Sequence, residues 1–422
     1  MGQQELHVRR RDRGSGGLAK VGTNQQILSG TNSFTGPVTI SGGRLLLADS
    51  SRALPYKSAV TVEAGGTLIL TGNTASIGSL AGSGKVIGET DSSQANGSLP
   101  PGVEFSSYLF VGYDDTSTTF SGVLANGAKA DQKLGLTKFG SGTLTLTGEN
   151  TFTAGTAIDG GTLRLGDGGK SGSISGNVVN SGTLAFNRAD DVTYAGVVSG
   201  TGSLEQKGPG TLTLTGVNTL TGMTTVSGGT LVLAGGSVAG AVTVQSGATL
   251  SGDPTGATAG SIGGALTVQD GGMLRIASGS QNLTTAGDLT LSGSALTALS
   301  LGAPTTTAAV SVGGNLTLGG RLNLTTAGGI TTGTYRIFDY TGKLSDTGLT
   351  VGNAPADSLV SVDTTTDKHV DLKVAAGRFW AGPTTGAAPG APTARTGRTG
   401  TAPGPRHGRR GRWRSLPARR AK

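Results

Sequence analysis

Leucine and threonine alternate along short runs of this chain, and two of these runs are nearly identical. Residues 143–152 read TLTLTGENTF and residues 211–220 read TLTLTGVNTL. Strict alternation of apolar and polar residues places the apolar side chains on one face of a strand. Glycine falls between the runs, where tight turns need positive φ. The pattern therefore predicts short, half-buried β-strands that are separated by turns.

Three copies of a longer unit contain these runs. They are LSGTNSFTGPVTISGGRLLL (28–47), LTGENTFTAGTAIDGGTLRL (146–165) and LTGVNTLTGMTTVSGGTLVL (214–233). In each copy an asparagine follows two residues after a glycine, and a Gly-Gly turn precedes the last strand. We expect the asparagine at a corner because it tolerates the left-handed conformation and can bond its own backbone. The residues that define this frame in the second and third copies are Gly148, Asn150, Gly160, Gly161, Leu163, Gly216, Asn218, Gly228, Gly229 and Leu231.

The spacing of the runs indicates a solenoid. A leucine follows the turn at positions 144, 163, 184, 212, 231, 250 and 274, at intervals of 19 to 28 residues. A leucine-rich repeat would need a helical segment, and a propeller blade would need about 40 residues. About 20 residues in three short strands make one turn of a right-handed parallel β-helix, whose layers share backbone hydrogen bonds. The predicted fold class is therefore all-β, a right-handed parallel β-helix.

The same pattern divides the chain into four segments. Residues 1–13 are predicted to be a disordered N-terminal segment, and residues 14–332 the β-helix. Residues 333–376 are predicted to be a C-terminal β-helix or cap segment, and residues 377–422 a disordered tail rich in Arg, Pro and Gly. Residues 88–137 contain Pro-Pro and alternate more weakly, so they form either further layers or a lateral loop.

Composition supports a thin core. Gly accounts for 77 of the 422 residues and aromatic residues for 4%, which is unusual for a compact enzyme but suits a β-helix. The absence of cysteine excludes disulfides and Cys-ligated metal sites. The basic charge lies at the ends, since residues 377–422 contain 11 Lys and Arg and no acid. This tail lacks the interleaved aromatic residues of a stacking platform, so we expect no nucleic-acid partner.

These residues resemble a known family. The stretch KFGSGTLTLTGENTFTAGTAIDGGTLRL (138–165) is similar to the autotransporter-associated β-strand repeat in passenger regions of Gram-negative autotransporters. The lead-in YLFVGYDDTSTTFSGVL (108–124) and the segment from GTYRIFDYTGK (333–343) are similar to segments of the same proteins. The resemblance covers about residues 14–376.

The resemblance implies a β-helical stalk for cell-surface display or adhesion, exported by type V secretion. It implies a location at the cell surface or outer membrane, or secretion, and an unidentified host or surface ligand. Such proteins begin with a signal peptide and attach to the membrane through a β-barrel, and we expect this chain to lack both. It would then be a truncated fragment, with residues 377–422 read out of frame. No enzymatic activity, cofactor, metal or small-molecule substrate is expected.

Two alternatives remain open at this stage, a carbohydrate-active β-helix enzyme and a degenerate gene product without an exported function. An enzyme would need two carboxylates facing each other across a cleft. The adjacent pairs Asp114–Asp115 and Asp190–Asp191 point to opposite faces of a strand, so we expect solvated turn residues. Lys138 and Lys207 are likewise expected to be solvated residues at coil edges.

Metal sites are not expected either. The stretch GDGGK (166–170) is a single copy of a calcium-loop pattern that needs many tandem copies. His7, His369 and His407 lie far apart in the sequence, which argues against a histidine-based zinc site or catalytic triad.

Overall fold

The computed structural model describes residues 6–8, 13–48, 52–72, 74–89, 105–253, 258–326, 331–355 and 358–377. Every strand or helix assigned among these residues is a β-strand. No helix that is long and apolar enough to span a membrane occurs in this part of the chain. The described residues belong to one unit, residues 1–378. Except for Gly377, the tail predicted at 377–422 lies outside the described residues.

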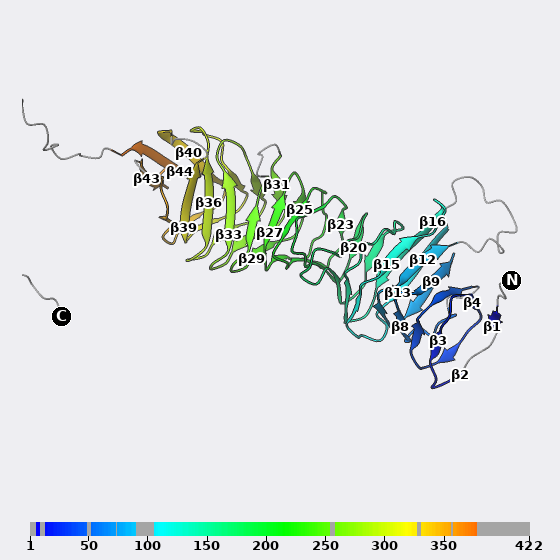
Figure 1. Cartoon of the computed structure of the whole chain (residues 1–422). Helices are drawn as coiled ribbons and strands as arrows, with labels where there is room; N and C mark the ends of the chain where they lie inside the picture. Colours follow the sequence, from blue (N-terminus) through cyan, green and yellow to red (C-terminus); the bar gives the residue numbers. More distant parts are fainter. Residues whose placement is uncertain are drawn as a thin grey trace, which may run out of the picture. The chain divides into compact units, whose positions relative to one another are not determined.

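The strands stack in layers as a parallel β-helix (Figure 1). Each turn of the chain visits three sides. One side is a single sheet of 15 strands, here called the long sheet. In most turns the strand that follows it along the chain lies on the second side, and the strand that precedes it lies on the third side. After β17 and β19 the second side has no strand, and the next strand is on the third side. Backbone N–H and C=O groups are thus paired with the layers before and after, and the predicted all-β, β-helical fold is confirmed.

The long sheet contains, in order, β3 (Leu18–Lys20), β6 (Val38–Ile40), β8 (Ala59–Val62), β11 (Ser79–Gly82), β14 (Thr118–Phe120), β17 (Thr143–Leu146), β19 (Thr162–Leu165), β21 (Thr183–Phe186), β24 (Ser203–Gln206), β26 (Thr224–Val226), β29 (Val242–Val244), β32 (Leu266–Val268), β35 (Leu289–Leu291), β38 (Leu316–Leu318) and β41 (Leu344–Asp346).

The second side contains two sheets. The first consists of β1 (Leu6–Val8), β4 (Gln25–Leu28), β7 (Gly43–Leu47), β9 (Gly66–Thr71), β12 (Lys85–Glu89) and β15 (Val123–Asn126). The other consists of β22 (Val192–Tyr194), β25 (Thr211–Leu214), β27 (Thr230–Leu233), β30 (Thr249–Ser251), β33 (Met273–Ala277), β36 (Leu296–Leu301), β39 (Arg321–Thr326) and β42 (Thr350–Val351).

The third side contains three sheets. The first is the pair β2 (Arg13–Gly14) and β5 (Ser33–Phe34). The next consists of β10 (Thr74–Ile77), β13 (Phe105–Val111), β16 (Gln132–Lys138), β18 (Thr156–Ile158), β20 (Val178–Asn180) and β23 (Val198–Ser199). The last consists of β28 (Ser237–Val238), β31 (Gly260–Ile262), β34 (Leu283–Thr285), β37 (Val310–Val312), β40 (Gly333–Tyr340), β44 (His369–Ala376) and β43 (Ser358–Asp363).

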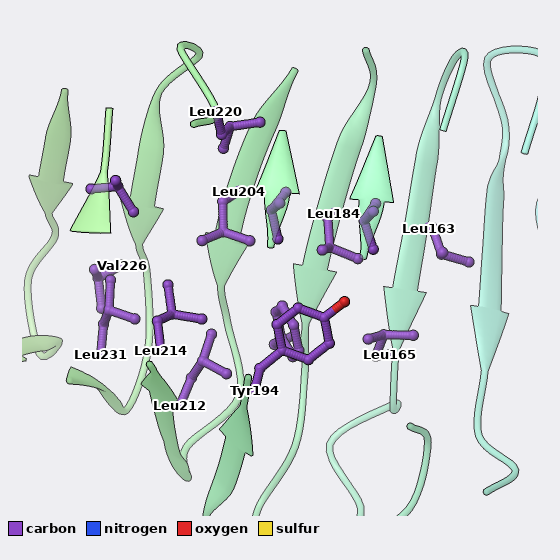
Figure 2. Packing of buried hydrophobic residues seen from close by; sticks show 14 of the residues in the cluster. Leu163, Leu165, Leu184, Tyr194, Leu204, Leu212, Leu214, Leu220, Val226 and Leu231 are labelled. Atoms are coloured by element: carbon purple, nitrogen blue, oxygen red, sulfur yellow. The ribbon is translucent and has the colours of Figure 1, made fainter. Parts of the chain in front are cut away.

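Aliphatic side chains fill the interior in columns that run from layer to layer. Leu144 and Leu146 of β17 are in register with Leu163 and Leu165 of β19. These leucines are buried, as is Leu231 in β27, and Figure 2 shows Leu163 and Leu165 beside the inward leucines of later layers. Burial of one such side chain contributes about 2 kcal/mol. The alternation of leucine with threonine therefore sets which side chains enter the core.

The second copy of the repeat occupies different sides of the solenoid from the first and third copies. With the strand before it, the first copy places β3 and β6 on the long sheet and β4 and β7 on the second side. The second copy places β16 and β18 on the third side and β17 and β19 on the long sheet. The third copy uses β24 and β26 on the long sheet and β25 and β27 on the second side. The same pairing thus works on two different pairs of consecutive sides.

The N-terminal prediction is wrong in one place. Leu6–Val8 forms β1 and pairs in parallel with β4, although residues 1–13 were expected to be disordered. Leu6 and Val8 continue the apolar alternation, so these residues can add a rung to the second side. Residues 1–5 and 9–12 lie outside the described residues.

Two further regions complete the stack. Residues 105–138 contain β13 to β16, which are paired with neighbouring layers, so this part is no lateral loop. Residues 90–104 lie outside the described residues. Near the C-terminus β40 is parallel to β37, but β44 is antiparallel to both β40 and β43. This reversal ends the parallel stacking on the third side within the segment 333–376.

Candidate binding pocket and its framework

The asparagines of the repeat bridge three layers. Asn150 accepts a hydrogen bond from Leu124 N–H at 2.9 Å and donates to the carbonyls of Gly148 at 3.0 Å and Ser173 at 2.8 Å. Asn218 repeats this pattern toward Val198 N–H, the Gly216 carbonyl and the Ser237 carbonyl. Both side chains are buried, so they satisfy backbone groups that the ladders leave unpaired at the corner.

One part of the expected reason for asparagine is confirmed, since each side chain bonds a backbone carbonyl two residues before it. The other part, a left-handed conformation, is wrong. Among the described residues, Asp115 and Lys368 are the non-glycine residues with positive φ. Neither asparagine adopts the left-handed conformation. An amide is needed because one side chain must both accept from one layer and donate to another.

Two glycines of the frame stand where a side chain would collide. A Cβ on Gly148 would lie 1.8 Å from the carbonyl oxygen of Gly122, and one on Gly216 would lie 2.8 Å from that of Gly196. Gly161 and Gly229, the second glycines of the Gly-Gly turns, have φ of +62° and +53°. A turn in this conformation strains any residue with a Cβ.

The first glycines of the turns pair with the layer before. Gly160 N–H donates to the Lys138 carbonyl at 3.3 Å, and Gly228 N–H donates to the Gln206 carbonyl at 3.2 Å. Lys138 and Gln206 are thus equivalent positions in the two copies.

Lys138 is buried, and the expectation of a solvated residue is wrong. Its side chain is 1% exposed. Its ammonium group donates to the carbonyls of Phe139, Gly140 and Gly160, which lie at one corner in two successive layers. Burial lowers the pKa of Lys138, opposed by the negative charges of Asp115 and Asp114. In the first copy Lys20 makes the same contacts, to the carbonyls of Val21, Gly22 and Gly42.

The third copy uses glutamine for the same task. Gln206 is 2% exposed, and its Nε2 donates to the carbonyls of Gly208 at 2.9 Å and Gly210 at 3.0 Å. Lys207, by contrast, is half exposed and pairs with Glu205 at 3.5 Å. An alignment of the two lysines misses this offset. The signal was present in the sequence, because Leu144 comes six positions after Lys138 but Leu212 comes only five positions after Lys207.

The first acid pair is used in turns. Asp114 Oδ1 accepts hydrogen bonds from the N–H and hydroxyl of Thr116. Asp115 Oδ1 accepts from the N–H of Ser141 at 2.7 Å and from its hydroxyl at 3.1 Å, in the next layer. These two bonds hold the pKa of Asp115 below its usual range. Each carboxylate therefore stabilises the backbone of a loop.

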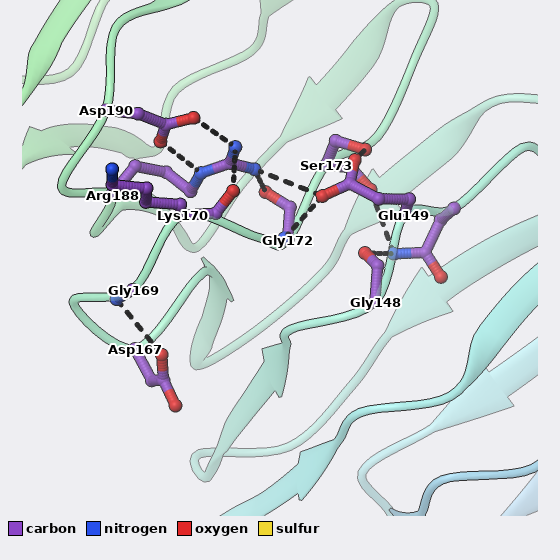
Figure 3. A network of polar contacts seen from close by, with 10 residues as sticks. Gly148, Glu149, Asp167, Gly169, Lys170, Gly172, Ser173, Arg188 and Asp190 are labelled. Carbon is purple, nitrogen blue, oxygen red and sulfur yellow. Dashed lines mark hydrogen bonds and ion pairs between the residues drawn. The ribbon is translucent and has the colours of Figure 1, made fainter.

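The second acid pair joins a polar network around Arg188 (Figure 3). Arg188 Nε and Nη2 donate to the two carboxylate oxygens of Asp190, each at 2.9 Å. The guanidinium also donates to the carbonyls of Gly172 and Lys170, both at 2.7 Å. These contacts lower the pKa of Asp190 and raise that of Arg188. Asp191 instead accepts from Thr211 N–H at 3.0 Å.

The metal-site candidates are also engaged in local contacts. Asp167 of the GDGGK stretch accepts from Gly169 N–H at 3.2 Å (Figure 3). His369 Nδ1 lies 2.7 Å from Asp339 Oδ1. Within the described ranges, no group of three or more His, Cys, Asp or Glu could hold a metal ion.

In the part of the chain that the structure describes, the third side has no strand in one layer near the N-terminus. Between β7 and β8 residues 52–58 form turns, whereas the layers before and after hold β5 and β10. Asn32 Nδ2 donates to the Ala53 carbonyl at 2.9 Å on one side. Gly78 N–H donates to the Ser58 carbonyl at 2.8 Å on the other. The segment is thus held at both ends, and its middle leaves the ladder.

A pocket with a volume of about 780 Å³ opens at this interruption. We call it the Tyr56 pocket. It is lined by residues 31–35 of the preceding layer, by Arg52 and residues 54–58, and by Ser76 and Tyr113 of later layers. Sequence reasoning missed it because its walls come from layers that are more than 20 residues apart. The one local signal is Pro55, which interrupts the apolar alternation.

Aromatic rings form one wall of the Tyr56 pocket. The rings of Tyr56 and Tyr113 meet edge to face with centroids 5.9 Å apart. Tyr113 in turn stacks on Phe139 at 4.9 Å with an interplanar angle of 20°. Such contacts restrain a ring in one orientation, so Tyr113 is held by its neighbour while Tyr56 stays 56% exposed.

Comparison with known proteins identifies the repeat. The passenger-associated-transport-repeat family matches residues 18–47, 136–165 and 204–233. The third residue of each match is the buried corner residue, Lys20, Lys138 or Gln206. The chain is 32% identical over 189 residues to the adhesin BmaC autotransporter of Brucella suis biovar 1 (strain 1330). That match covers 44% of this chain and 5% of the relative, so the chain spans a small part of the relative's length.

Proposed function

Because the chain is an autotransporter passenger stalk built from β-strand repeats, we propose that it is displayed at the bacterial cell surface and takes part in adhesion. The observation that carries this proposal is the match to an autotransporter adhesin, on a solenoid whose long sheet continues through 15 strands. Continuous backbone pairing makes such a stack stiff along its axis. A stiff stack is suited to holding a binding surface away from the cell.

We propose a non-enzymatic role. The repeat family and the adhesin relative favour it. The carboxylates of both acid pairs are bound to loop backbone or to Arg188. Among the described residues, those that line the Tyr56 pocket include no Asp or Glu. An enzyme of the glycosidase type would need two carboxyl groups beside its substrate.

An adhesion assay tests the proposal. Beads that carry the purified chain are incubated with epithelial cell monolayers and with monolayers whose surface glycans have been removed enzymatically. On untreated cells, we expect several times more beads that carry the chain to be retained than beads coated with albumin. Loss of this excess on the deglycosylated cells would show that the ligand is a glycan. Equal retention of both kinds of bead would contradict a role in adhesion.

A cleavage assay tests the second part of the proposal. The chain is incubated with polygalacturonate and other acidic polysaccharides, and new chain ends are measured by chromatography. No increase over buffer is expected. Release of short fragments, abolished by substitution of Asp190 or Asp114, would establish the enzyme alternative instead.

A further inference from the structure

The Tyr56 pocket contains a buried hydroxyl that lacks a partner. Ser58 is 2% exposed, and its Oγ has no hydrogen-bond partner among the described residues. Ser58 also lines the pocket. A buried polar group is normally paired, so a ligand that offers a hydroxyl or a carboxylate oxygen would complete this site once the Ser58 side chain turns toward the pocket.

Aromatic rings with apolar faces also line the pocket beside this hydroxyl. Tyr56 is exposed to the pocket, and Tyr113 is held behind it by Phe139. A tyrosine ring offers an apolar face and a polar tip to the same ligand. Sugar rings match this arrangement, because they have an apolar C–H face and hydroxyl groups along the rim.

Positive charge completes the lining. Lys57 Nζ lies 5.8 Å from the centroid of the Tyr56 ring, and Arg52 lines the pocket as well. The described residues that line the pocket contain no acid. Asp115, which accepts from Ser141, lies close enough for Lys57 to help lower its pKa. A carboxylate on the ligand would be a second anionic partner for Lys57, beside Asp115.

From these contacts we infer that the Tyr56 pocket binds an acidic saccharide, one to three sugar residues that carry a carboxylate. A volume of about 780 Å³ is within the range of small-ligand sites. The sugar face packs on Tyr56, a ring hydroxyl bonds Ser58 Oγ, and the carboxylate faces Lys57. The inference rests on the proposed function in one respect only, since it names the ligand class for adhesion.

A peptide is the competing ligand, and the structure favours the saccharide. An extended peptide would add to a strand edge, but the missing rung is filled by residues 52–58. Leu54 of this segment is buried in the core and Ser58 pairs with Gly78. What remains is a pocket in the side of the stack rather than an open strand edge.

Titration calorimetry of the full chain tests the inference. The probes are trigalacturonate, 3′-sialyllactose, the neutral maltotriose and an acidic tyrosine-containing hexapeptide. We expect one of the two acidic saccharides to bind, and maltotriose to bind about 10-fold more weakly. Tyr56→Ala is expected to weaken binding of the acidic saccharide about 10-fold or more. Lys57→Gln should remove most of the preference for acid over neutral sugar, and Ser58→Ala should weaken both.

Matched controls keep the test sharp. Val179→Ala removes an apolar side chain that is exposed to the same extent as Tyr56, 56%, and Lys129→Gln removes an exposed lysine elsewhere. Both should bind like the parent chain. Circular dichroism of each variant shows whether the β-helix is retained.

Three results would overturn the inference. They are absence of saccharide binding at millimolar concentration, binding that Tyr56→Ala and Lys57→Gln leave unchanged, and binding of the hexapeptide alone with the same sensitivity. The two proposals fail separately. If the coated beads adhere and Tyr56→Ala has no effect on them, the saccharide site fails and adhesion stands. If trigalacturonate binds but no beads adhere, adhesion fails and the saccharide site stands.

Discussion

The second and third copies of the repeat place different side chains at the same buried corner. Lys138 serves three carbonyls in two layers, whereas Gln206 serves two carbonyls. Neither corner residue has a carboxylate partner within hydrogen-bonding distance in the described structure. The comparison shows that the corner requires N–H donors, and that either a neutral amide or a charged ammonium group can supply them. Burial disfavours the charged form of Lys138, and its pKa is lowered for this reason.

The copies also differ in how closely their layers approach. Gly148 stands closer to the preceding carbonyl than Gly216 does, with 1.8 Å against 2.8 Å for a Cβ at each position. The difference belongs to this glycine and not to the whole layer, because at the first glycine of the Gly-Gly turn a Cβ would lie 2.3 Å from the nearest atom in the third copy and 3.1 Å in the second.

The largest expected effect comes from Gly148→Ala. The new methyl group collides with the Gly122 carbonyl, and we expect the free energy of unfolding to fall by about 3–5 kcal/mol. Gly216→Ala should cost about 1–2 kcal/mol, because the contact needs less movement. Urea unfolding followed by circular dichroism measures both. Gly293→Ala, where a Cβ would meet nothing within 4 Å, is the control, and equal losses at Gly148 and Gly216 would refute the difference between the copies.

The next effect separates Lys138 from Lys207. Lys138→Met leaves three carbonyls without their donor, so we expect a loss of about 2–3 kcal/mol in the free energy of unfolding. Lys207→Met should change it by less than about 0.5 kcal/mol, since Lys207 is half exposed. Hydrogen exchange at residues 139–142 and 160–162 should increase in the first variant only. Similar losses for both lysines would show that the corner assignment is wrong.

The smallest effect is a pH dependence that the third copy lacks. The pKa of Lys138 in the folded chain lies below its ordinary value of 10.5. At a pH between the pKa of Lys138 in the folded chain and its ordinary value in the unfolded chain, the unfolded chain binds more protons. The free energy of unfolding therefore rises with pH in this window, and below the window it does not depend on this group. The difference in unfolding free energy between the parent and Lys138→Gln should therefore move in favour of the parent as pH approaches 10.5. Gln206→Met should show no such trend relative to the parent.

The fold could be predicted because its rule is local and repeated. Alternating leucine and threonine set the inward columns, and the recurring Gly-Gly turn set the period, so one strand implied the next. The polar interior was harder. Lys138 looks like a surface residue by composition, and only its distance from Leu144 places it with Gln206 rather than Lys207.

The Tyr56 pocket could not be predicted in the same way. It exists because residues 52–58 depart from the repeat, and its walls combine layers that include Phe34, Tyr56 and Tyr113. Which residues of successive layers face each other depends on the lengths of all intervening turns. Those lengths vary from turn to turn, so no local pattern encodes the juxtaposition.

The one-side shift of the second copy has a consequence for how such chains change in evolution. A unit that functions on two different pairs of sides is not tied to one phase of the stack. A gene can therefore gain or lose about 20 codons at many places. The layers on either side of the change still pair with each other. Length becomes the freely variable property of the molecule, while the departures from the repeat, such as the one at residues 52–58, are where individual character can accumulate.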